Sequence, residues 1–403
     1  MSAHVLVIGG LRPVHKRLKA RGARLSLVIE THRIKPDDPP FYGRILGVAK
    51  DAPLAEYMAA ARAVHSLDPI TAVGAYHELF QDMAAHIASA LELPFHALDT
   101  ITTVRHKDVM RQRLRAAGVD PTIACRVQTA DHVRAFAATH GYPVVLKPVD
   151  GWASIGVSVL RGDADIAPAV DWLQRGSPES AMLVEQHLAG DEISVEAMSE
   201  RGVHRIVCAT QKFKETVHYV ELGHIIPAPL PPEVEAAVRA TVDRALTAVG
   251  IRDGASHTEV MLTATGPRIV ETHTRLGGDQ IPELIEFVSG VDLMDLWARQ
   301  TLGERVLGEV PDRLPESKYA AIWFVTPEAV GTVERVDGEA EARAMPGVTS
   351  VQTWKPAGSK VDGLRDSFSR GVGIIAIGES PGEAMSRAQD AGKRIRFVVC
   401  CGG

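Results

Sequence analysis

The sequence predicts an α/β protein of several domains, and three observations support this fold class. The 403 residues exceed what one hydrophobic core usually contains, because domains average about 100–200 residues. Short apolar runs alternate with amphipathic stretches in the first quarter of the chain, which is typical of a parallel sheet covered by helices. Later apolar runs are separated by glycine-containing turns, which indicate β-hairpins. We therefore expect a parallel-sheet domain followed by α+β parts.

Residues 1–103 predict a Rossmann-like domain. The run HVLVIGG at 4–10 predicts a buried strand, residues 12–21 an amphipathic helix, and residues 24–30 a second strand. Residues 68–94 supply a further strand, a turn and a helix. The glycine pair after the first strand does not complete a GxGxxG motif, so we interpret it as a tight turn and not as a nucleotide site.

Residues 104–180 predict a second, smaller domain. Residues 104–118 are rich in Lys and Arg and stop at Gly, which predicts one cationic helix. Residues 131–141 predict another helix. A strand–turn–strand pattern follows at 143–160, with Lys147 near the end of its first strand.

Residues 181–305 predict a larger α+β domain. They repeat the strand–turn–strand pattern at 181–199, predict a helix at 233–250, and end in a hairpin within 257–280. Residues 306–403 predict a C-terminal α+β part with strands, bends and a closing helix.

Composition and charge exclude nucleic-acid and membrane proteins. Hydrophobic residues make up 45% of the chain, and the formal net charge of −6 provides no broad basic surface for nucleic acid. No apolar run reaches the roughly 18–20 residues that a membrane helix requires, and the N-terminal residues predict a strand instead of a signal peptide. The four cysteines form no CxxC motif. We expect a cytoplasmic protein that acts on small molecules.

The hairpin carries the most informative polar residues. If it is symmetric about Thr265, Glu259 lies opposite Glu271 and His257 lies opposite His273. Opposed side chains have Cβ atoms about 4.5–5.5 Å apart, and like charges there are destabilising. The two carboxylates therefore require a shared proton, a nearby cation or a metal, and carboxylates that act together with substrate phosphates suit Mg²⁺. The alternative is a solvent-exposed edge with two unrelated glutamates.

A phosphate site is expected near the same hairpin. Lys147 precedes the turn 150–156, whose small residues let backbone N–H groups approach phosphate oxygens while the lysine acts as a point charge. From residue chemistry alone, Lys147 and Lys107 are either phosphate ligands or solvated charges. Glu185 and Glu192 are likewise either ligands or ordinary surface acids.

The order of these elements resembles the ATP-grasp superfamily. Four separated segments, found in the same order between roughly residues 5 and 305, carry the resemblance: HKDVMRQRLRAAGV, VVLKPVDGWASIGV, LVEQHLAGDEISVE and TEVMLTATGPRIVETHTRLGG. Within the superfamily, ELGHIIPAPL and RLGGDQIPELI are similar to segments of carboxylate–amine ligases, especially the L-amino-acid ligases that join two amino acids. The closing KRIRFVV is similar to the last helix and strand of the subfamily that includes biotin carboxylase.

The resemblance implies a role for each matching residue. ATP would be bound by Lys107, Lys147 and Ser154 at the phosphates and lid loop, by Glu185, Gln186 and Leu188 at the adenine, and by Glu192 at the ribose. The metal would be bound by Glu259, Glu271 and His273. The substrates would be bound by Glu221, His224, Arg275, Gly277, Gly278 and Asp279. Lys147 and Arg275 would be catalytic.

His273 departs from the family pattern, which commonly has Asn two residues after the second metal carboxylate. Imidazole is a poorer ligand for Mg²⁺ and a better one for Mn²⁺ or Zn²⁺. Mg²⁺ is therefore the expected metal, with Mn²⁺ as the alternative. The other interpretation is that His273 hydrogen-bonds a phosphate or a water.

The resemblance implies an ATP-dependent ligase. A substrate carboxylate would attack the γ-phosphate to give an acyl-phosphate and ADP, and an amine would then displace the phosphate. Glu221, His224 or Asp279 would take the proton of the amine. Two alternatives stay open: a small-molecule kinase, and an ATP-binding protein without turnover. The superfamily leans toward dimers, so a homodimer is expected.

Overall fold

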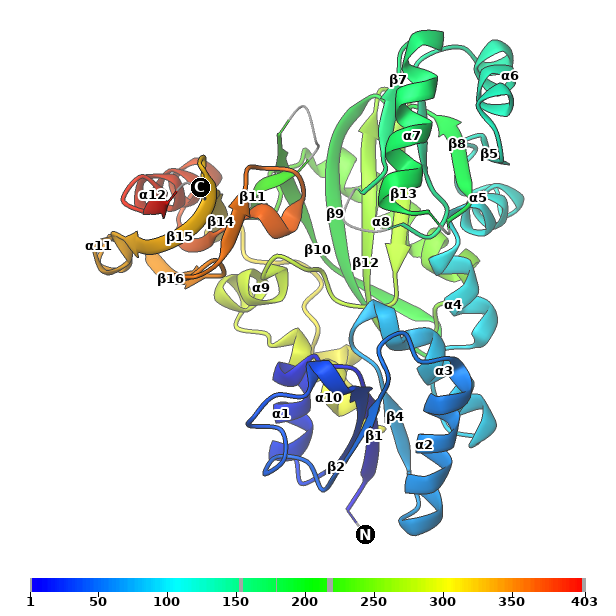
Figure 1. Ribbon diagram of the computed structural model, residues 1–403, viewed down its shortest axis with the longest axis vertical. Helices are drawn as coiled ribbons and strands as arrows, with labels where there is room; N and C mark the ends of the chain where they lie inside the picture. The colour runs from blue at the N-terminus through cyan, green and yellow to red at the C-terminus, as the bar shows by residue number, and fades with distance from the viewer. Residues whose placement is uncertain (1, 152–154, 179, 216–219, 401–403) are drawn as a thin grey trace.

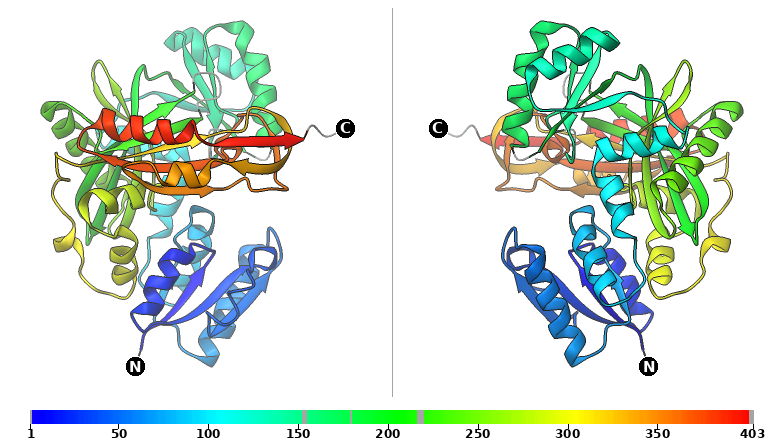
Figure 2. Two further views of the ribbon diagram at one scale, coloured as in Figure 1. Left: turned by 90° about the vertical axis from the view of Figure 1, so that its left-hand side faces the viewer. Right: turned by 90° about the vertical axis from the view of Figure 1, so that its right-hand side faces the viewer.

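The computed structural model describes residues 2–151, 155–178, 180–215 and 220–400. Four β-sheets account for the strands of these residues (Figure 1). Figure 2 shows the N-terminal domain at one end of the molecule and the helices α6 (Ala130–His140) and α7 (Ile166–Gly176) at the opposite end, with the largest sheet between them. No helix in the described ranges is both long and apolar enough to cross a membrane.

The N-terminal sheet is parallel, as the sequence predicts. Its strands in spatial order are β3 (Arg44–Val48), β2 (Arg24–Glu30), β1 (His4–Ile8) and β4 (Ala72–Gly74). Its helices are α1 (Arg12–Ala20), α2 (Leu54–Leu67) and α3 (Gln81–Ala90). All five residues of β1 are buried, as expected for a strand covered on both faces.

The chain bends at the glycine pair after β1, where a tight turn is expected, and the absence of a nucleotide site there stays a prediction. Gly9 has φ +80°, and its backbone N–H donates to the carbonyl of Val28 at 3.0 Å. A Cβ on Gly9 would lie 2.1 Å from the ring of Phe80, so only glycine fits here.

The cationic helix expected at 104–118 is present as α5 (Lys107–Ala116), but it begins three residues later than expected. A separate helix, α4 (Leu98–Arg105), ends just before it. His106 between them has an extended backbone, with φ −101° and ψ 102°. This break lets the backbone N–H of Lys107 donate to the carbonyl of Val149 at 3.0 Å, which ties the start of α5 to the smaller domain.

The smaller domain is a four-stranded sheet with two helices. In spatial order the strands are β5 (Ala124–Val127), β8 (Met182–Gln186), β6 (Val144–Pro148) and β7 (Ser158–Leu160), and the helices are α6 (Ala130–His140) and α7 (Ile166–Gly176). The predicted hairpin around Lys147 is confirmed, because β6 and β7 pair antiparallel. We name this sheet the lid sheet.

The central sheet has eight strands. In spatial order they are β13 (Gly266–His273), β12 (Gly254–Thr263), β9 (Gly190–Glu200), β10 (Val203–Lys214), β11 (Glu221–Ile226), β14 (Tyr319–Val325), β18 (Val372–Gly378) and β16 (Val348–Thr353). The associated helices are α8 (Pro232–Val249), α9 (Ile281–Ser289), α10 (Leu293–Thr301) and α12 (Pro381–Gly392). Proline near the start of α8 and Gly250, in the left-handed conformation, just past its end explain where this helix begins and stops.

The C-terminal residues share the central sheet with the preceding domain. Strands β14, β18 and β16 continue the sheet beyond β11. A separate three-stranded sheet contains β17 (Lys360–Asp362), β15 (Val330–Asp337) and β19 (Arg396–Cys400), near the short helix α11 (Glu339–Arg343). The division into 1–103, 104–180, 181–305 and 306–403 stays a prediction.

The register of the β12–β13 hairpin agrees with the prediction at the two pairs of polar residues that were predicted. Glu259 pairs with Glu271 and His257 pairs with His273. A β-bulge follows Glu259, so that the strands beyond it pair one residue out of the expected symmetry.

Candidate active site

A cavity between the lid sheet and the central sheet brings together most residues assigned to ATP. Val145 and Val159 line it from the lid sheet, and Met261 and Val270 line it from the central sheet. Such apolar walls on two sides are typical of a site for a flat ring. Eight of the predicted residues line the cavity: Lys107, Lys147, Glu185, Gln186, Leu188, Glu192, Glu259 and Glu271. Ser154 lies outside the described residues.

Glu185 is buried beneath this cavity and holds two cations. Its carboxylate pairs with Lys147 and with Nε of Arg111, the latter at 2.9 Å. Burial alone would raise the pKa of Glu185, but the charges of Arg111 and Lys147 lower it to about 2. The carboxylate therefore stays ionised and fixes Lys147 in the cavity. Sequence reasoning missed Arg111, although it lies four residues after Lys107 on the same face of α5.

Lys107 connects the turn after the lid strand β6 to Glu271, one of the two carboxylates predicted to bind the metal. Its Nζ lies 2.8 Å from Oε2 of Glu271 and donates to the carbonyl of Gly151 at 2.7 Å. Burial alone would lower the pKa of Lys107, but Glu271 raises it above its ordinary value. The lysine is therefore a charged group next to the turn predicted to cover the phosphates.

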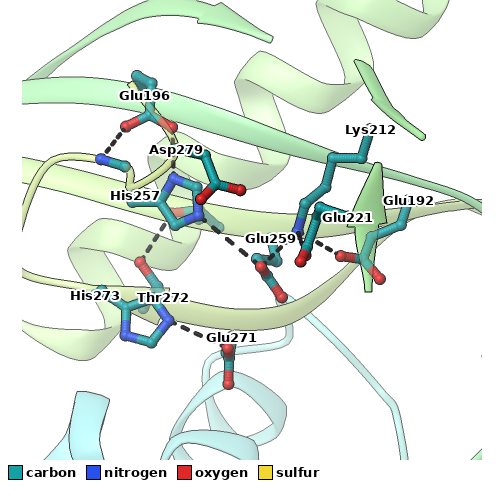
Figure 3. Close-up of polar contacts among 12 residues, drawn as sticks. Glu192, Glu196, Lys212, Glu221, His257, Glu259, Glu271, Thr272, His273 and Asp279 are labelled. Carbon is teal, nitrogen blue, oxygen red and sulfur yellow. Dashed lines mark hydrogen bonds and ion pairs between the residues drawn. The ribbon is translucent and has the colours of Figure 1, made fainter. Parts of the chain in front are cut away.

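Three carboxylates surround Lys212 (Figure 3). Nζ of Lys212 lies 2.6 Å from Glu259, 2.7 Å from Glu192 and 3.5 Å from Glu221. One oxygen from each of these glutamates lies within 4.8 Å of the others, which is close enough to share a metal ion. Lys214 adds a second contact to Glu192 at 2.6 Å. The all-oxygen donor set fits Mg²⁺, and Lys212 neutralises part of its charge.

The sequence missed both lysines as site residues. Lys212 and Lys214 are two residues apart on β10, on either side of Phe213, so the period of two was a usable signal that they share a face. Both lysines contact Glu192 and Glu221, so these two glutamates lie side by side. The sequence analysis had assigned Glu221 to the substrate and Glu192 to the ribose of ATP.

His273 has carboxylates at both ring nitrogens. Nδ1 lies 2.9 Å from Glu78, and Nε2 lies 3.2 Å from Glu271. Burial alone would lower the pKa of His273, but the two carboxylates raise it above its ordinary value. Two carboxylates at one imidazole favour its protonated form, and the role of His273 as a metal ligand stays a prediction.

Glu78 also holds Arg275, so the N-terminal domain contributes directly to the site. Nε of Arg275 donates to Oε2 of Glu78 at 3.0 Å. Glu78 lies in a single 3-10 turn after β4 (Glu78–Phe80), a segment without any motif. The turn also contacts the β12–β13 hairpin through His273. Because the segment around Glu78 contains no motif, the sequence alone did not indicate this contact.

Gly277 lies against the buried pair of Glu196 and His257. Its backbone N–H donates to Glu196 at 2.9 Å, and a Cβ at this position would lie 2.9 Å from Nδ1 of His257. Gly278 has open space around its Cα. The structure therefore explains glycine at 277 by packing within the protein.

Asp279 is bound by a residue of the C-terminal part. Arg370 donates to its two oxygens at 2.7 and 2.5 Å, and Nε2 of His224 lies 2.8 Å from Oδ2. The carboxylate is buried, which would raise its pKa, but His224 and Arg370 hold it well below its ordinary range. Arg370 also stacks on Phe324, with its guanidinium carbon 4.0 Å from the ring centre. No sequence pattern linked Arg370 to Asp279.

Comparisons with known proteins agree with this architecture. The model of the ATP-grasp domain matches residues 140–283, and the model of the L-amino acid ligase C-terminal domain 2 matches residues 323–400. The uncharacterized protein y4rH of Sinorhizobium fredii is 30% identical, over 87% of this chain and 72% of that protein. Dapdiamide A synthase of Enterobacter agglomerans is 26% identical, over 74% of this chain and 73% of that enzyme.

A solved structure extends the likeness to the whole fold. The L-amino acid ligase from Bacillus licheniformis superposes with a TM-score of 0.86 at 20% identity, over 99% of both chains. The matched domains and the sequence relatives therefore define an ATP-grasp enzyme that forms C–N bonds. Within that class, the chain belongs to the L-amino acid ligase family of ATP-dependent carboxylate–amine ligases.

Proposed function

We propose that the chain joins the carboxylate of one amino acid to the amine of another through an acyl-phosphate, with ATP and Mg²⁺. The observation that carries this proposal is that Glu259 and Glu271, paired on the neighbouring strands β12 and β13, line the same cavity as Lys107 and Lys147. One wall thus offers carboxylates for a divalent cation, and the other offers ammonium groups for phosphates. Mg²⁺ would neutralise charge on the transferred phosphoryl group.

We propose that Lys107, Lys147 and Arg275 act on the phosphoryl group. Lys147 is held by Glu185 and Arg275 is held by Glu78, so both cations are positioned before ATP binds. A positioned cation needs no reorganisation when charge develops, and this is the main source of catalysis in phosphoryl transfer. The planar fork of Arg275 also suits the oxyanion formed when the amine attacks.

We propose His224 as the group that accepts the proton of the amine. Its Nε2 is held by Asp279, and its buried Nδ1 has no hydrogen-bond partner in the described part of the chain. Asp279 itself is a poor base because Arg370 and His224 keep its pKa low. Glu221 stays as the alternative base.

His273 is proposed to orient Glu271, with Mg²⁺ preferred and Mn²⁺ as the alternative. A homodimer and a cytoplasmic location stay predictions.

The proposal is tested by incubating the protein with ATP, Mg²⁺ and amino acids, singly and in pairs. Phosphate release that requires a pair, with a product lighter than the two amino acids by one water, supports ligation. A phosphorylated product from one amino acid alone would favour a kinase. Absence of phosphate release with every pair would contradict the amino-acid substrate class.

A further inference from the structure

A second cavity lies between the N-terminal sheet and the central sheet, and we name it the interdomain cavity. Its walls come from the end of β4, the turn between β9 and β10, the start of β12 and the end of α10. No described residue lines both this cavity and the ATP cavity. Gly254 in its wall and Glu259 in the ATP cavity are about 17 Å apart along β12, at about 3.4 Å per residue.

Three arginines line the interdomain cavity without a partner for their guanidinium groups. They are Arg201 in the β9–β10 turn, Arg252 just before β12, and Arg305 after α10. All three are exposed, and within the described ranges none of these guanidinium groups has an ion pair or a hydrogen bond. Guanidinium groups bind carboxylates and phosphates through two parallel hydrogen bonds.

The acidic side chains of the same cavity are held by other donors. Glu304 pairs with Arg299 at 2.8 Å. Glu200 accepts a backbone N–H at 2.8 Å, and Asp253 accepts a backbone N–H at 2.9 Å. Each carboxylate therefore already has a donor, whereas the three guanidinium groups remain available to a ligand.

Aromatic side chains form another wall of the interdomain cavity. The rings of Tyr76 and Trp297 meet edge to face, with centres 4.8 Å apart, and His96 lies beside them. Burial lowers the pKa of His96 to about 4, so the imidazole is neutral at pH 7. At Gly254 a Cβ would lie 3.3 Å from His96 and 3.4 Å from Trp297, so glycine keeps this wall open.

We propose that the interdomain cavity is a second ligand site, which binds a small organic anion with a flat apolar body. The carboxylate or phosphate group of the ligand binds Arg201, Arg252 and Arg305, and its apolar body lies against Tyr76 and Trp297. The ligand contacts β4 and β12 at once, so it ties the N-terminal sheet to the strand that carries Glu259. This inference does not depend on the proposed ligation.

Calorimetric titration of the whole chain with phenyl phosphate, benzoate and benzamide tests the proposal. Saturating ADP with Mg²⁺ is present throughout, so that the ATP cavity is filled. We expect one saturable site for at least one anion, and affinity at least tenfold lower for the neutral benzamide. Tighter binding of phenyl phosphate identifies a phosphate site, and tighter binding of benzoate a carboxylate site. No saturable binding of either anion, or equal binding of benzamide, would overturn the proposal.

A double variant locates the site. Arg252→Ala combined with Arg305→Ala is expected to weaken anion binding by about tenfold or more, because charge-assisted hydrogen bonds are lost. The matched control Arg396→Ala removes an exposed arginine of β19 and is expected to leave binding unchanged. The Tm of each variant without ligand shows whether it is folded. Unchanged anion affinity in the folded double variant would refute the site.

Discussion

Nδ1 of His257 lies 2.5 Å from one oxygen of Glu196, and the other oxygen of this carboxylate accepts the backbone N–H of Gly277 at 2.9 Å. Glu196 is fully buried. It joins β9 and β12 to the loop after β13, and so links the strand that carries Glu259 to the segment that carries Arg275. We expect the positions of Glu259 and Arg275 to depend on this contact.

Replacement of Glu196 by Gln is expected to lower the pKa of His257. Burial alone lowers this pKa, but the charge and hydrogen bond of Glu196 raise it to about 9. NMR titration of the imidazole is expected to give a value near 9 in the natural chain. The Glu196→Gln variant is expected to give a value below the ordinary 6.5 or so. A pKa that stays near 9 in the variant would assign the shift to another group.

The same pair predicts how the free energy of unfolding depends on pH. The folded-state pKa of about 9 exceeds the unfolded value, so the proton on His257 stabilises the folded state. This contribution is complete below about pH 6.5 and is lost as the pH rises through 9. Urea unfolding is expected to show a decrease of up to about 3 kcal/mol over this range, and Glu196→Gln should remove most of it. A free energy that does not change with pH here would be evidence against the ion pair.

Glu271→Gln is expected to lower kcat by a factor of about one hundred or more, because one of the two carboxylates predicted to bind the metal, Glu259 and Glu271, loses its charge. The matched control is Glu286→Gln, an exposed glutamate of α9, which is expected to retain full activity. Thermal unfolding of both variants shows whether the fold is intact. Full turnover in folded Glu271→Gln would remove Glu271 from the site.

Glu185→Gln is expected to destabilise the chain by about 3–5 kcal/mol, because it leaves Arg111 and Lys147 buried without a carboxylate. Glu235→Gln breaks a partly exposed pair with Arg239 on α8 and is expected to cost less than about 1 kcal/mol. Denaturant unfolding compares the two variants. Equal and small losses would mean that the Glu185 cluster contributes little to stability.

His273→Asn is expected to leave the ratio of activities with Mg²⁺ and Mn²⁺ unchanged within about twofold. Both ring nitrogens face carboxylates, so the imidazole has no free lone pair for a metal. Turnover of the two proteins is measured with each metal at saturating ATP. A clear increase in the ratio of Mg²⁺ activity to Mn²⁺ activity in the variant would support His273 as a metal ligand.

The sequence predicted the parts of the site that depend on local pattern. The two-residue period of strands and the assumed symmetry about Thr265 placed Glu259 opposite Glu271, and this pairing is correct because the β-bulge after Glu259 shifts the register by one residue. The lid hairpin around Lys147 and the bend at Gly9 follow from equally local signals. These features need only the residues within one hairpin or one turn.

The missed features depend on contacts between distant segments. Glu78 meets His273 across 195 positions of sequence, and Arg370 meets Asp279 across 91 positions. The segments around Glu78 and Arg370 contain no motif, so no sequence pattern indicates either contact. The break at His106 between α4 and α5 also depends on a distant contact. The backbone N–H of Lys107 donates to the carbonyl of Val149, whereas the sequence on both sides of His106 is typical of a helix.

The central claim, that a substrate carboxylate is activated by ATP before the amine attacks, is tested most directly by isotope transfer. The protein is incubated with ATP, Mg²⁺, an amine substrate and an amino acid whose carboxylate oxygens are ¹⁸O. An acyl-phosphate requires that one ¹⁸O atom passes from the carboxylate to the released phosphate, and mass spectrometry is expected to find phosphate with one ¹⁸O. Product formed together with phosphate that contains no ¹⁸O would contradict the account.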